Sequence, residues 1–290
     1  MTIDPRSLLF VPSNRPDRFQ RAAASRADAV ILDLEDSVGV SQKVGSRENL
    51  QAGADLATAA GTSVYVRVNP VGTEWHEKDL AAAVRIGARG VVLPKCEDPE
   101  VVMEVEQRLA NYEAAGGHAL EVVLIVETAR GILAAERLAQ PGTRTRRMSF
   151  GAYDFALDMG VQVHTSGMLL ASVRAHVALA ATAAGIQAID TAFADIRDPE
   201  AMRRQTDEAL NLGFSGKFAI HPDQVVIVND VLSPSSAEIE TARRVVAAFR
   251  DAEERGIAAI TVDDKLVDYP IAQRSEAILT RAGAYGLSAS

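Results

Sequence analysis

Short apolar runs recur along the chain, and each of them ends in polar or charged residues. Eight such runs occur, at residues 8–12, 29–34, 64–68, 91–94, 122–126, 148–152, 186–190 and 217–220. Most stretches between them carry apolar residues at helical spacing. Strands and helices that alternate in this way predict a (β/α)8 barrel, whose functional residues lie at the C-terminal strand ends. We therefore expect the polar residues after the runs to share one site.

The chain continues well beyond the last apolar run. A segment rich in serine and proline near residue 232 predicts a barrel domain over residues 1–232 and a helical extension over residues 233–290. In the extension we expect a helix over residues 237–254 with Ser236 as its N-cap, because acidic residues follow in the first turn. A turn at Asp263-Asp264 and a final helix over about residues 271–281 complete the prediction.

Composition narrows the class of protein. A chain of 290 residues and 30.9 kDa can form one barrel with an appendage. No apolar run is long enough for a membrane span, and the N-terminus lacks the pattern of a secretory signal. The single cysteine, Cys96, excludes an internal disulfide and favours a reducing, cytoplasmic setting. The net charge of −9 argues against nucleic acid as a partner.

Two carboxylates stand at the ends of neighbouring predicted strands. Glu127 ends EVVLIVE, and Asp154 follows MSFGAY. Mg²⁺ prefers oxygen ligands and commonly keeps water or substrate oxygens in its other positions, so this pair predicts a magnesium site. The alternative is that each carboxylate caps a helix or pairs with a basic residue.

Glycines frame the segment that carries Asp154. Gly151 and Gly160 stand on either side of residues 152–158, which are expected to form a turn and a helix start. A glycine there allows close approach of the backbone to a ligand, or a positive φ, although an ordinary turn would use one equally. Asp158 lies one helical turn after Asp154, and we expect it to be structural.

Arg67 is the strongest candidate for binding an anion. Alternation in VYVRV places Arg67 and Tyr65 on the face opposite the valines, and in a barrel that face points either to the interior or to the helices. An arginine that faces the barrel interior is costly unless it meets an anion, and its planar fork matches a carboxylate. It could instead pair with Glu35 or Glu127 for structure, and both roles are compatible.

An acidic cluster and a lysine are expected near the same strand ends. Asp33, Glu35 and Asp36 follow one strand, and Lys95 follows another in VVLPK. Glu35, Asp36 and Lys95 could form a salt-bridge network that orders the metal ligands. Lys95 could also form an imine with a substrate, but that requires a lowered pKa, whereas nearby carboxylates favour the charged form.

Other chemical signals are weak. His221 ends the last strand and could line the same rim, and the chain has no G-x-S-x-G, P-loop or H-E-x-x-H motif. Cys96 has no obvious histidine partner, so we expect it to be inert. A basic group near the first two strand ends could bind phosphates or merely offset the acidic cluster; it comprises Arg15, Arg18, Lys43 and Arg47.

Longer motifs follow one another over nearly the whole chain. They are LLFVPSNRPDRF, DAVILDLEDSV, VRVNP, VVLPK, LIVETARGI, GAYDFALDMG, AIDTAFADIRDPE, GFSGKFAIHPDQV and LSPSSAEIETARRVVAAF. Together they resemble the citrate lyase β-subunit-like (HpcH/HpaI aldolase/citrate lyase) family. The resemblance implies a TIM barrel, Mg²⁺ held by Glu127 and Asp154, Arg67 on the oxygens of a 2-oxoacid, and coenzyme A as the thioester carrier. On this basis we also expect substrate contacts from Gly151 and Ala152, and coenzyme A contacts from Asn14, Arg15 and Arg18.

The tail resembles that of the CoA-lyase branch of this family. Residues 263–270, DDKLVDYP, are similar to the pattern D-G-K-L-I-D-x-P, whose last aspartate reaches the active site of a neighbouring subunit. The resemblance thus gives Asp268 a catalytic role in a homo-oligomer, expected to be a trimer; the alternative is that Asp268 only caps the helix that follows it, with Pro270 at the start. Asp264 stands where glycine is usual, and Ser13 stands where the early loop often has glycine.

These observations together predict a Mg²⁺-dependent lyase. It would cleave a 3-hydroxy-acyl-CoA such as malyl-CoA or citramalyl-CoA to acetyl-CoA and a 2-oxoacid, with Arg67 stabilising charge and Asp268 transferring a proton. Three alternatives stay open: a malate or citramalate synthase that also hydrolyses the thioester, the β subunit of a multi-subunit citrate lyase, and a non-catalytic binder of 2-oxoacids.

Overall fold

The computed structural model of the protein describes residues 4–114, 119–140, 142–163 and 167–287. It separates into two compact units. The first unit is Asp4–Asp230, and the second contains the chain from Val231 onward.

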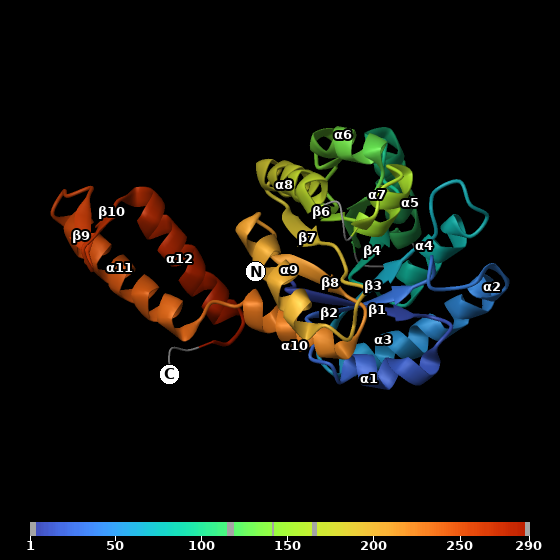
Figure 1. Ribbon diagram of the computed structural model, residues 1–290. Coiled ribbons are helices and arrows are strands. Elements are labelled where there is room, and N and C mark those ends of the chain that lie inside the picture. The colour runs from blue at the N-terminus through green and yellow to red at the C-terminus, as the bar shows by residue number, and fades with distance from the viewer. Residues whose placement is uncertain (1–3, 115–118, 141, 164–166, 288–290) are drawn as a thin grey trace. The chain divides into compact units, whose positions relative to one another are not determined.

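The first unit is a closed barrel of eight parallel strands, in which each strand pairs with the next and β8 pairs with β1 (Figure 1). The (β/α)8 barrel expected from the sequence is confirmed. The strands are β1 Ser7–Pro12, β2 Ala29–Asp33, β3 Ser63–Arg67, β4 Gly90–Leu93, β5 Glu121–Val126, β6 Thr145–Phe150, β7 Gln187–Asp190 and β8 Gly216–Ala219.

Helices follow the strands and lie around the barrel (Figure 1). They are α1 Phe19–Ala23, α2 Lys43–Ser46, α3 Leu50–Ala59, α4 His76–Arg85, α5 Pro99–Glu113, α6 Ala129–Leu138, α7 Ala152–Asp158, α8 Gly167–Ala183, α9 Pro199–Asn211 and α10 Pro222–Val231. Short 3-10 turns precede three of the early helical segments, at Pro16–Arg18, Val40–Gln42 and Arg47–Asn49. In the described part of the chain, no helix is both long enough and apolar enough to cross a membrane.

Alternation along the strands separates the apolar side chains into two layers. One cluster fills the barrel interior and includes Leu8, Ile31, Tyr65 and Phe218. The other lies between the sheet and the helices, and it includes Val64 and the valines that alternate with Tyr65 and Arg67. Burial of each such side chain contributes about 1.5–3 kcal/mol. The packed barrel thus fixes the positions of the strand ends, and with them the positions of the residues that directly follow.

The second unit consists of two helices and a hairpin: α11 Ser236–Glu254, β9 Ile260–Val262, β10 Lys265–Val267 and α12 Tyr269–Ala284. Helices α11 and α12 pack against each other. Phe249 of α11 lies edge-on to Tyr269 of α12, with ring centroids 5.1 Å apart. The expected turn is present, and both Asp263 (φ 49°) and Asp264 (φ 59°) take left-handed conformations, as a two-residue hairpin turn requires.

Two expectations for the tail were wrong in detail. The N-cap of α11 is Ser235 rather than Ser236, because Glu238 stands three residues after Ser235 and completes a reciprocal capping box with it. Helix α12 begins at Tyr269, two residues before the predicted start, because Asp268 serves as its N-cap and accepts from the Ile271 N–H at 3.4 Å.

Candidate active site

Arg67 lies at the end of β3 on the same face as Tyr65, and of the two directions that the sequence left open this face points to the barrel interior. Its guanidinium forms a bidentate pair with Asp33 at the end of β2, through Nε at 2.7 Å and Nη2 at 2.6 Å. Nη1 lies 3.0 Å from Glu35, and the guanidinium lies over the Phe10 ring at 4.7 Å. Asp33 and Glu35 thus hold Arg67 in place. Only two of the five N–H groups of its guanidinium bond to Asp33.

Lys95 belongs to the expected network with Glu35 and Asp36. Its ammonium lies 3.0 Å from buried Glu35 and 3.9 Å from exposed Asp36. Partial burial opposes the charged form, but the hydrogen bond and charge of Glu35 outweigh it and raise the pKa of Lys95. Burial raises the pKa of Glu35, against the charges of Arg67 and Lys95. A charged Lys95 orders the rim and is unsuited to imine formation.

Glu127 follows β5 and is buried, with 4% of its surface exposed. Its Oε1 accepts from the Lys95 backbone N–H at 2.8 Å. Lys95 takes a left-handed φ of 55°, which brings that N–H to the carboxylate. Burial, and then the negative charge of Asp154, raise the pKa of Glu127 to about 8. A buried carboxylate that feels the charge of a second carboxylate suits a cation bound by both.

Asp154 does not lie directly at a strand end, where the sequence placed it. Strand β6 ends at Phe150, and Asp154 is in the first turn of α7 rather than at the strand end. Gly151 permits this arrangement, since a Cβ atom there would lie 2.4 Å from Glu127 Oε2. Its φ of −103° is ordinary, so close approach is the reason for the glycine. Asp158 is structural, as expected: it accepts from the Ala129 N–H of α6 at 2.7 Å.

Lys43 and Arg47 are bound inside the first unit and are not available to a phosphate. The Lys43 ammonium donates to the Glu35 carbonyl at 3.0 Å and to the Asn69 side chain at 2.6 Å. Arg47 pairs with buried Asp79 at 2.5 Å. Of the two alternatives left open for this basic group, phosphate binding is less favoured for Lys43 and Arg47, because neutral oxygens accept from Lys43 and acidic Asp79 pairs with Arg47.

The three residues expected to contact coenzyme A differ in their surroundings. Asn14 donates to Gln42 at 2.6 Å. Arg15 forms an exposed ion pair with Asp17 at 2.7 Å. Arg18 lines a cavity, and it is the only one of the three that does so in the described cavities.

That cavity has a volume of about 450 Å³ and combines basic and apolar side chains. His221, which the sequence placed near the rim, lies in its wall and contacts Arg21, with the two side chains 3.3 Å apart. Phe10 belongs both to this wall and to the surroundings of Arg67, so the cavity is next to the site. The lining is Leu9, Phe10, Val11, Pro12, Arg18, Arg21, Ala22, Ala194, Ile196, Ile220, His221 and Pro222.

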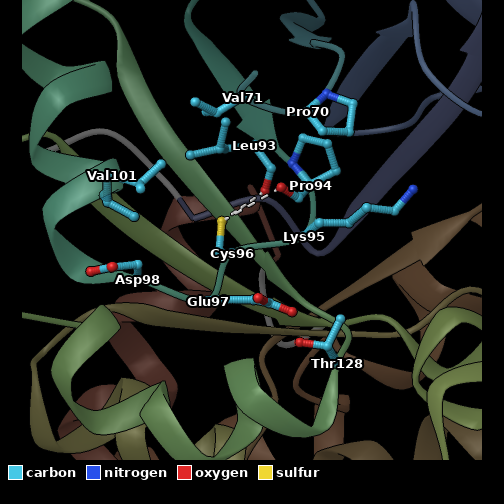
Figure 2. A pocket seen from close by; sticks show the side chains of 11 residues that line it. Pro70, Val71, Leu93, Pro94, Lys95, Cys96, Glu97, Asp98, Val101 and Thr128 are labelled. Carbon is cyan, nitrogen blue, oxygen red and sulfur yellow. Dashed lines mark hydrogen bonds between the residues drawn. The ribbon is translucent and has the colours of Figure 1, made fainter. Parts of the chain in front are cut away.

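A second cavity, of about 380 Å³, lies beside Lys95 and Thr128 (Figure 2). Its lining is mostly apolar, and Cys96 belongs to it. The Cys96 thiol donates to the Leu93 carbonyl at 3.1 Å, and burial raises its pKa. The Lys95 side chain extends away from the thiol (Figure 2). Cys96 is therefore inert, as expected, because a buried thiol with a raised pKa is a poor nucleophile.

Sequence reasoning placed Asp33 in the acidic cluster without its pairing to Arg67, and it gave Thr191 no role in the site. Asp33 is the register partner of Arg67 on the neighbouring strand, and its bidentate pairing depends on that register. Thr191, after β7, accepts from the Ala152 N–H at 3.1 Å. The alternation in VYVRV places Arg67 on the face of Tyr65, but the bonds to Asp33 and Thr191 depend on strand register and loop contacts, which leave no local pattern in the sequence.

The chain resembles known proteins over nearly its whole length. It is 30% identical to citrate lyase subunit beta of Leuconostoc mesenteroides subsp. cremoris, over 96% of this chain and 93% of that protein. It is 35% identical to a (3S)-malyl-CoA thioesterase of Cereibacter sphaeroides, over 91% and 89% of the two chains. The solved structure of CitE from Mycobacterium tuberculosis in complex with magnesium, acetoacetate and coenzyme A is 33% identical, covers 96% of this chain and 97% of that chain, and has a TM-score of 0.78.

A family model for HpcH/HpaI aldolase/citrate lyase matches residues 6–222, which is most of the barrel. The relatives in this family are enzymes, as their names state. With this match and with relatives above 30% identity over most of its length, the chain belongs to the HpcH/HpaI aldolase/citrate lyase family.

Proposed function

We propose that the protein is a Mg²⁺-dependent carbon–carbon lyase. It would cleave a 3-hydroxy-acyl-CoA of the malyl-CoA or citramalyl-CoA type to acetyl-CoA and a 2-oxoacid, in the cytoplasm. The observation that carries the proposal is the arrangement at the C-terminal end of the barrel, where a fixed arginine lies near the buried Glu127 and the half-buried Asp154. The names of the relatives and the ligands of the CitE complex support it.

The residues present fit a Mg²⁺ ion. Glu127 and Asp154 supply only oxygen ligands, and the negative charge of Asp154 adds to burial in raising the pKa of Glu127. The described residues contain no group of three or more His, Cys, Asp or Glu side chains that could hold a metal. Two carboxylates, with water or substrate oxygens, are a common set for Mg²⁺. When bound, the ion would stabilise negative charge on the oxygens of the acid half of the substrate.

Arg67 would bind the carboxylate of the acid half. Asp33 and Glu35 orient its guanidinium before substrate arrives, so little reorganisation accompanies the reaction. The N–H groups of Arg67 that do not bond to Asp33 or Glu35 can donate to the substrate carboxylate. Arg67 can therefore pair with these two residues and also stabilise charge on the substrate. Gly151 and Ala152, which begin the segment that carries Asp154, would line the substrate site next to Glu127.

The proposed cleavage breaks the bond between the carbon bearing the hydroxyl group and the carbon next to the thioester. The hydroxyl oxygen loses its proton to solvent water and becomes the carbonyl oxygen of the 2-oxoacid, while the electrons of the broken C–C bond form the enolate of acetyl-CoA. A proton delivered to the enolate carbon completes acetyl-CoA. We assign this delivery to Asp268 of a neighbouring subunit, and the reverse condensation would use the same aspartate as a base.

Asp268 also caps α12, so a test must separate the two roles. Asp268→Asn retains the cap, since asparagine is an equally good N-cap, and removes the acid. If Asp268 acts in a neighbouring barrel, mixing inactive Asp268→Asn subunits with inactive Glu127→Gln subunits restores part of the turnover. No rescue despite verified subunit exchange, or full turnover by a monomer, would contradict action in a neighbouring subunit.

The cavity that contains Arg18 is the proposed site for the nucleotide end of coenzyme A. Arg18 and Arg21 provide positive charge for phosphate, and the apolar wall suits a purine ring. Asn14 and Arg15 lie close in sequence, and each would have to leave its present partner, Gln42 or Asp17, to join them.

A thioesterase activity is the second candidate, because relatives at 33–35% identity are named (3S)-malyl-CoA thioesterase. Purified protein incubated with Mg²⁺ and a panel of acyl-CoA thioesters, with and without 2-oxoacids, separates the candidates. A lyase releases acetyl-CoA and a 2-oxoacid, whereas a thioesterase releases free coenzyme A thiol. A subunit of a citrate lyase complex would act on a carrier-bound thioester and fail on all free acyl-CoA substrates.

A further inference from the structure

Helix α7 carries Asp154 but cannot cap its own N-terminus with a side chain. Its N-cap is Gly151, which must be glycine because a Cβ there would collide with Glu127. The first N–H groups of a helix lack partners within the helix, and an unsatisfied buried N–H is costly. The start of α7 therefore depends on acceptors from elsewhere.

Thr191 supplies one of these acceptors. Its side-chain oxygen accepts from the Ala152 N–H at 3.1 Å, and Thr191 is only 4% exposed. Ala152 is the first residue of α7, and Asp154 lies in the same helical turn. A change in the position of the Thr191 hydroxyl would thus move the turn that carries the proposed metal ligand.

Buried charges hold Thr191 in turn. The Lys217 ammonium of β8 donates to the Thr191 carbonyl at 2.7 Å and to Asp190 at 2.6 Å, and Lys217 is fully buried. Arg174 of α8 makes a bidentate pair with Asp190, at 2.9 and 3.0 Å. The arrangement connects two strands and a helix to one carbonyl group, so the end of β7 has little freedom.

We propose that Thr191, fixed by the buried Lys217–Asp190 pair, is a positioning residue that sets the start of α7 and thereby places Asp154 opposite Glu127 for cation binding. The inference rests on the proposed metal site. Groups that orient metal ligands typically affect metal affinity by about 10- to 100-fold. A purely structural threonine would affect folding stability without that loss.

The test is Mn²⁺ binding by the purified full-length protein without substrate, with free Mn²⁺ measured by electron paramagnetic resonance. Thr191→Val keeps the shape of the side chain and removes the acceptor, so we expect about 10- to 100-fold weaker binding. Thr191→Ser restores the hydroxyl and should bind nearly as the native protein does. Thr145→Val is the matched control: it removes a buried threonine hydroxyl that bonds to Glu106 at the other end of β6.

Comparison with Asp154→Asn separates failure of this inference from failure of the metal site. Native Mn²⁺ affinity in Thr191→Val, together with weakened binding in Asp154→Asn, would overturn the positioning role alone. Native affinity in Asp154→Asn would overturn the metal site and the inference with it. If Thr191→Val does not fold, Thr191→Ala removes the acceptor without placing a methyl group against the N–H, and the same outcomes apply.

Discussion

The two ends of strand β5 carry two glutamates with opposite surroundings. Glu121 begins the strand, and its carboxylate meets Arg89, Arg147 and the Tyr65 hydroxyl. Burial would raise its pKa, but Arg147, Arg89 and Tyr65 outweigh that effect and hold the pKa of Glu121 below its ordinary value. Glu127 follows the strand, faces the charge of Asp154, and has a pKa raised to about 8.

Within one strand, the glutamate at the N-terminal end thus serves stability, and the glutamate at the C-terminal end serves the proposed function. At the N-terminal end, cations and hydrogen-bond donors compensate each acidic group, so the cluster stabilises the barrel and needs no ligand. At the C-terminal end, the protein keeps two carboxylates close together at a cost in stability. Charges left uncompensated in this way are typical of sites that bind a ligand. The missing charge at the Glu127 end is the one that a cation would supply.

The largest expected effect comes from the arginine at the C-terminal end. Arg67→Lys should lower turnover by at least about 10²-fold, nearly as much as Arg67→Ala, because a point charge cannot replace a fork held by Asp33. Arg89→Lys at the opposite end is the matched control and should retain turnover. Steady-state kinetics on folded protein checks both, and near-native turnover of Arg67→Lys would show that the fork geometry is irrelevant.

A smaller effect is expected from the glutamate at the N-terminal end. Glu121→Gln weakens the partnership of Arg147, whose side chain is 3% exposed, and should lower the free energy of unfolding by about 1–3 kcal/mol. Turnover per folded molecule should stay near native. Urea denaturation measures the change. Equal stability of Glu121→Gln and native protein would remove the distinction between the two ends.

The pH dependence of stability should have opposite signs at the two ends. In metal-free protein, Glu127 binds its proton more tightly when folded, so the stability it contributes is lost as pH rises from about 4.5 to about 8. The slope is at most about 1.4 kcal/mol per pH unit, and Glu127→Gln should flatten it. Glu121 has a lowered pKa, so its contribution is lost only as pH falls below about 4.5. Thermal unfolding with a chelator across this pH range measures the change. If stability rises toward pH 8 in native protein but not in Glu127→Gln, the predicted sign of the Glu127 contribution is contradicted.

The barrel could be predicted from the sequence because it depends on local pattern. Eight apolar runs separated by stretches with helical spacing fix the strands, and alternation in VYVRV correctly placed Arg67 on the same face as Tyr65. The partner of Arg67 depends instead on strand register, since Asp33 and Arg67 lie opposite each other only when β2 and β3 pair as observed. Sequence spacing carries no record of that register.

Long-range burial decides a point that the sequence left open. Lys43 and Arg47 have the sequence appearance of an exposed basic group, and only the folded chain brings Asn69 and Asp79 to them. By contrast, the choice between Ser235 and Ser236 as N-cap was decided by a local rule, the three-residue spacing to Glu238. The charged residues of the site could thus be predicted from the sequence, whereas the residues that they bond to could not.

The most direct test of the account is the Mg²⁺ dependence of acyl-CoA cleavage in three proteins: native, Glu127→Gln and Glu121→Gln. We predict that native protein and Glu121→Gln require Mg²⁺ and lose turnover in excess chelator, and that Glu127→Gln is inactive at every Mg²⁺ concentration while remaining folded. Full turnover of native protein in excess chelator, or Mg²⁺-supported turnover of Glu127→Gln at the native rate, would contradict the claim that this end of the barrel is a magnesium-dependent active site.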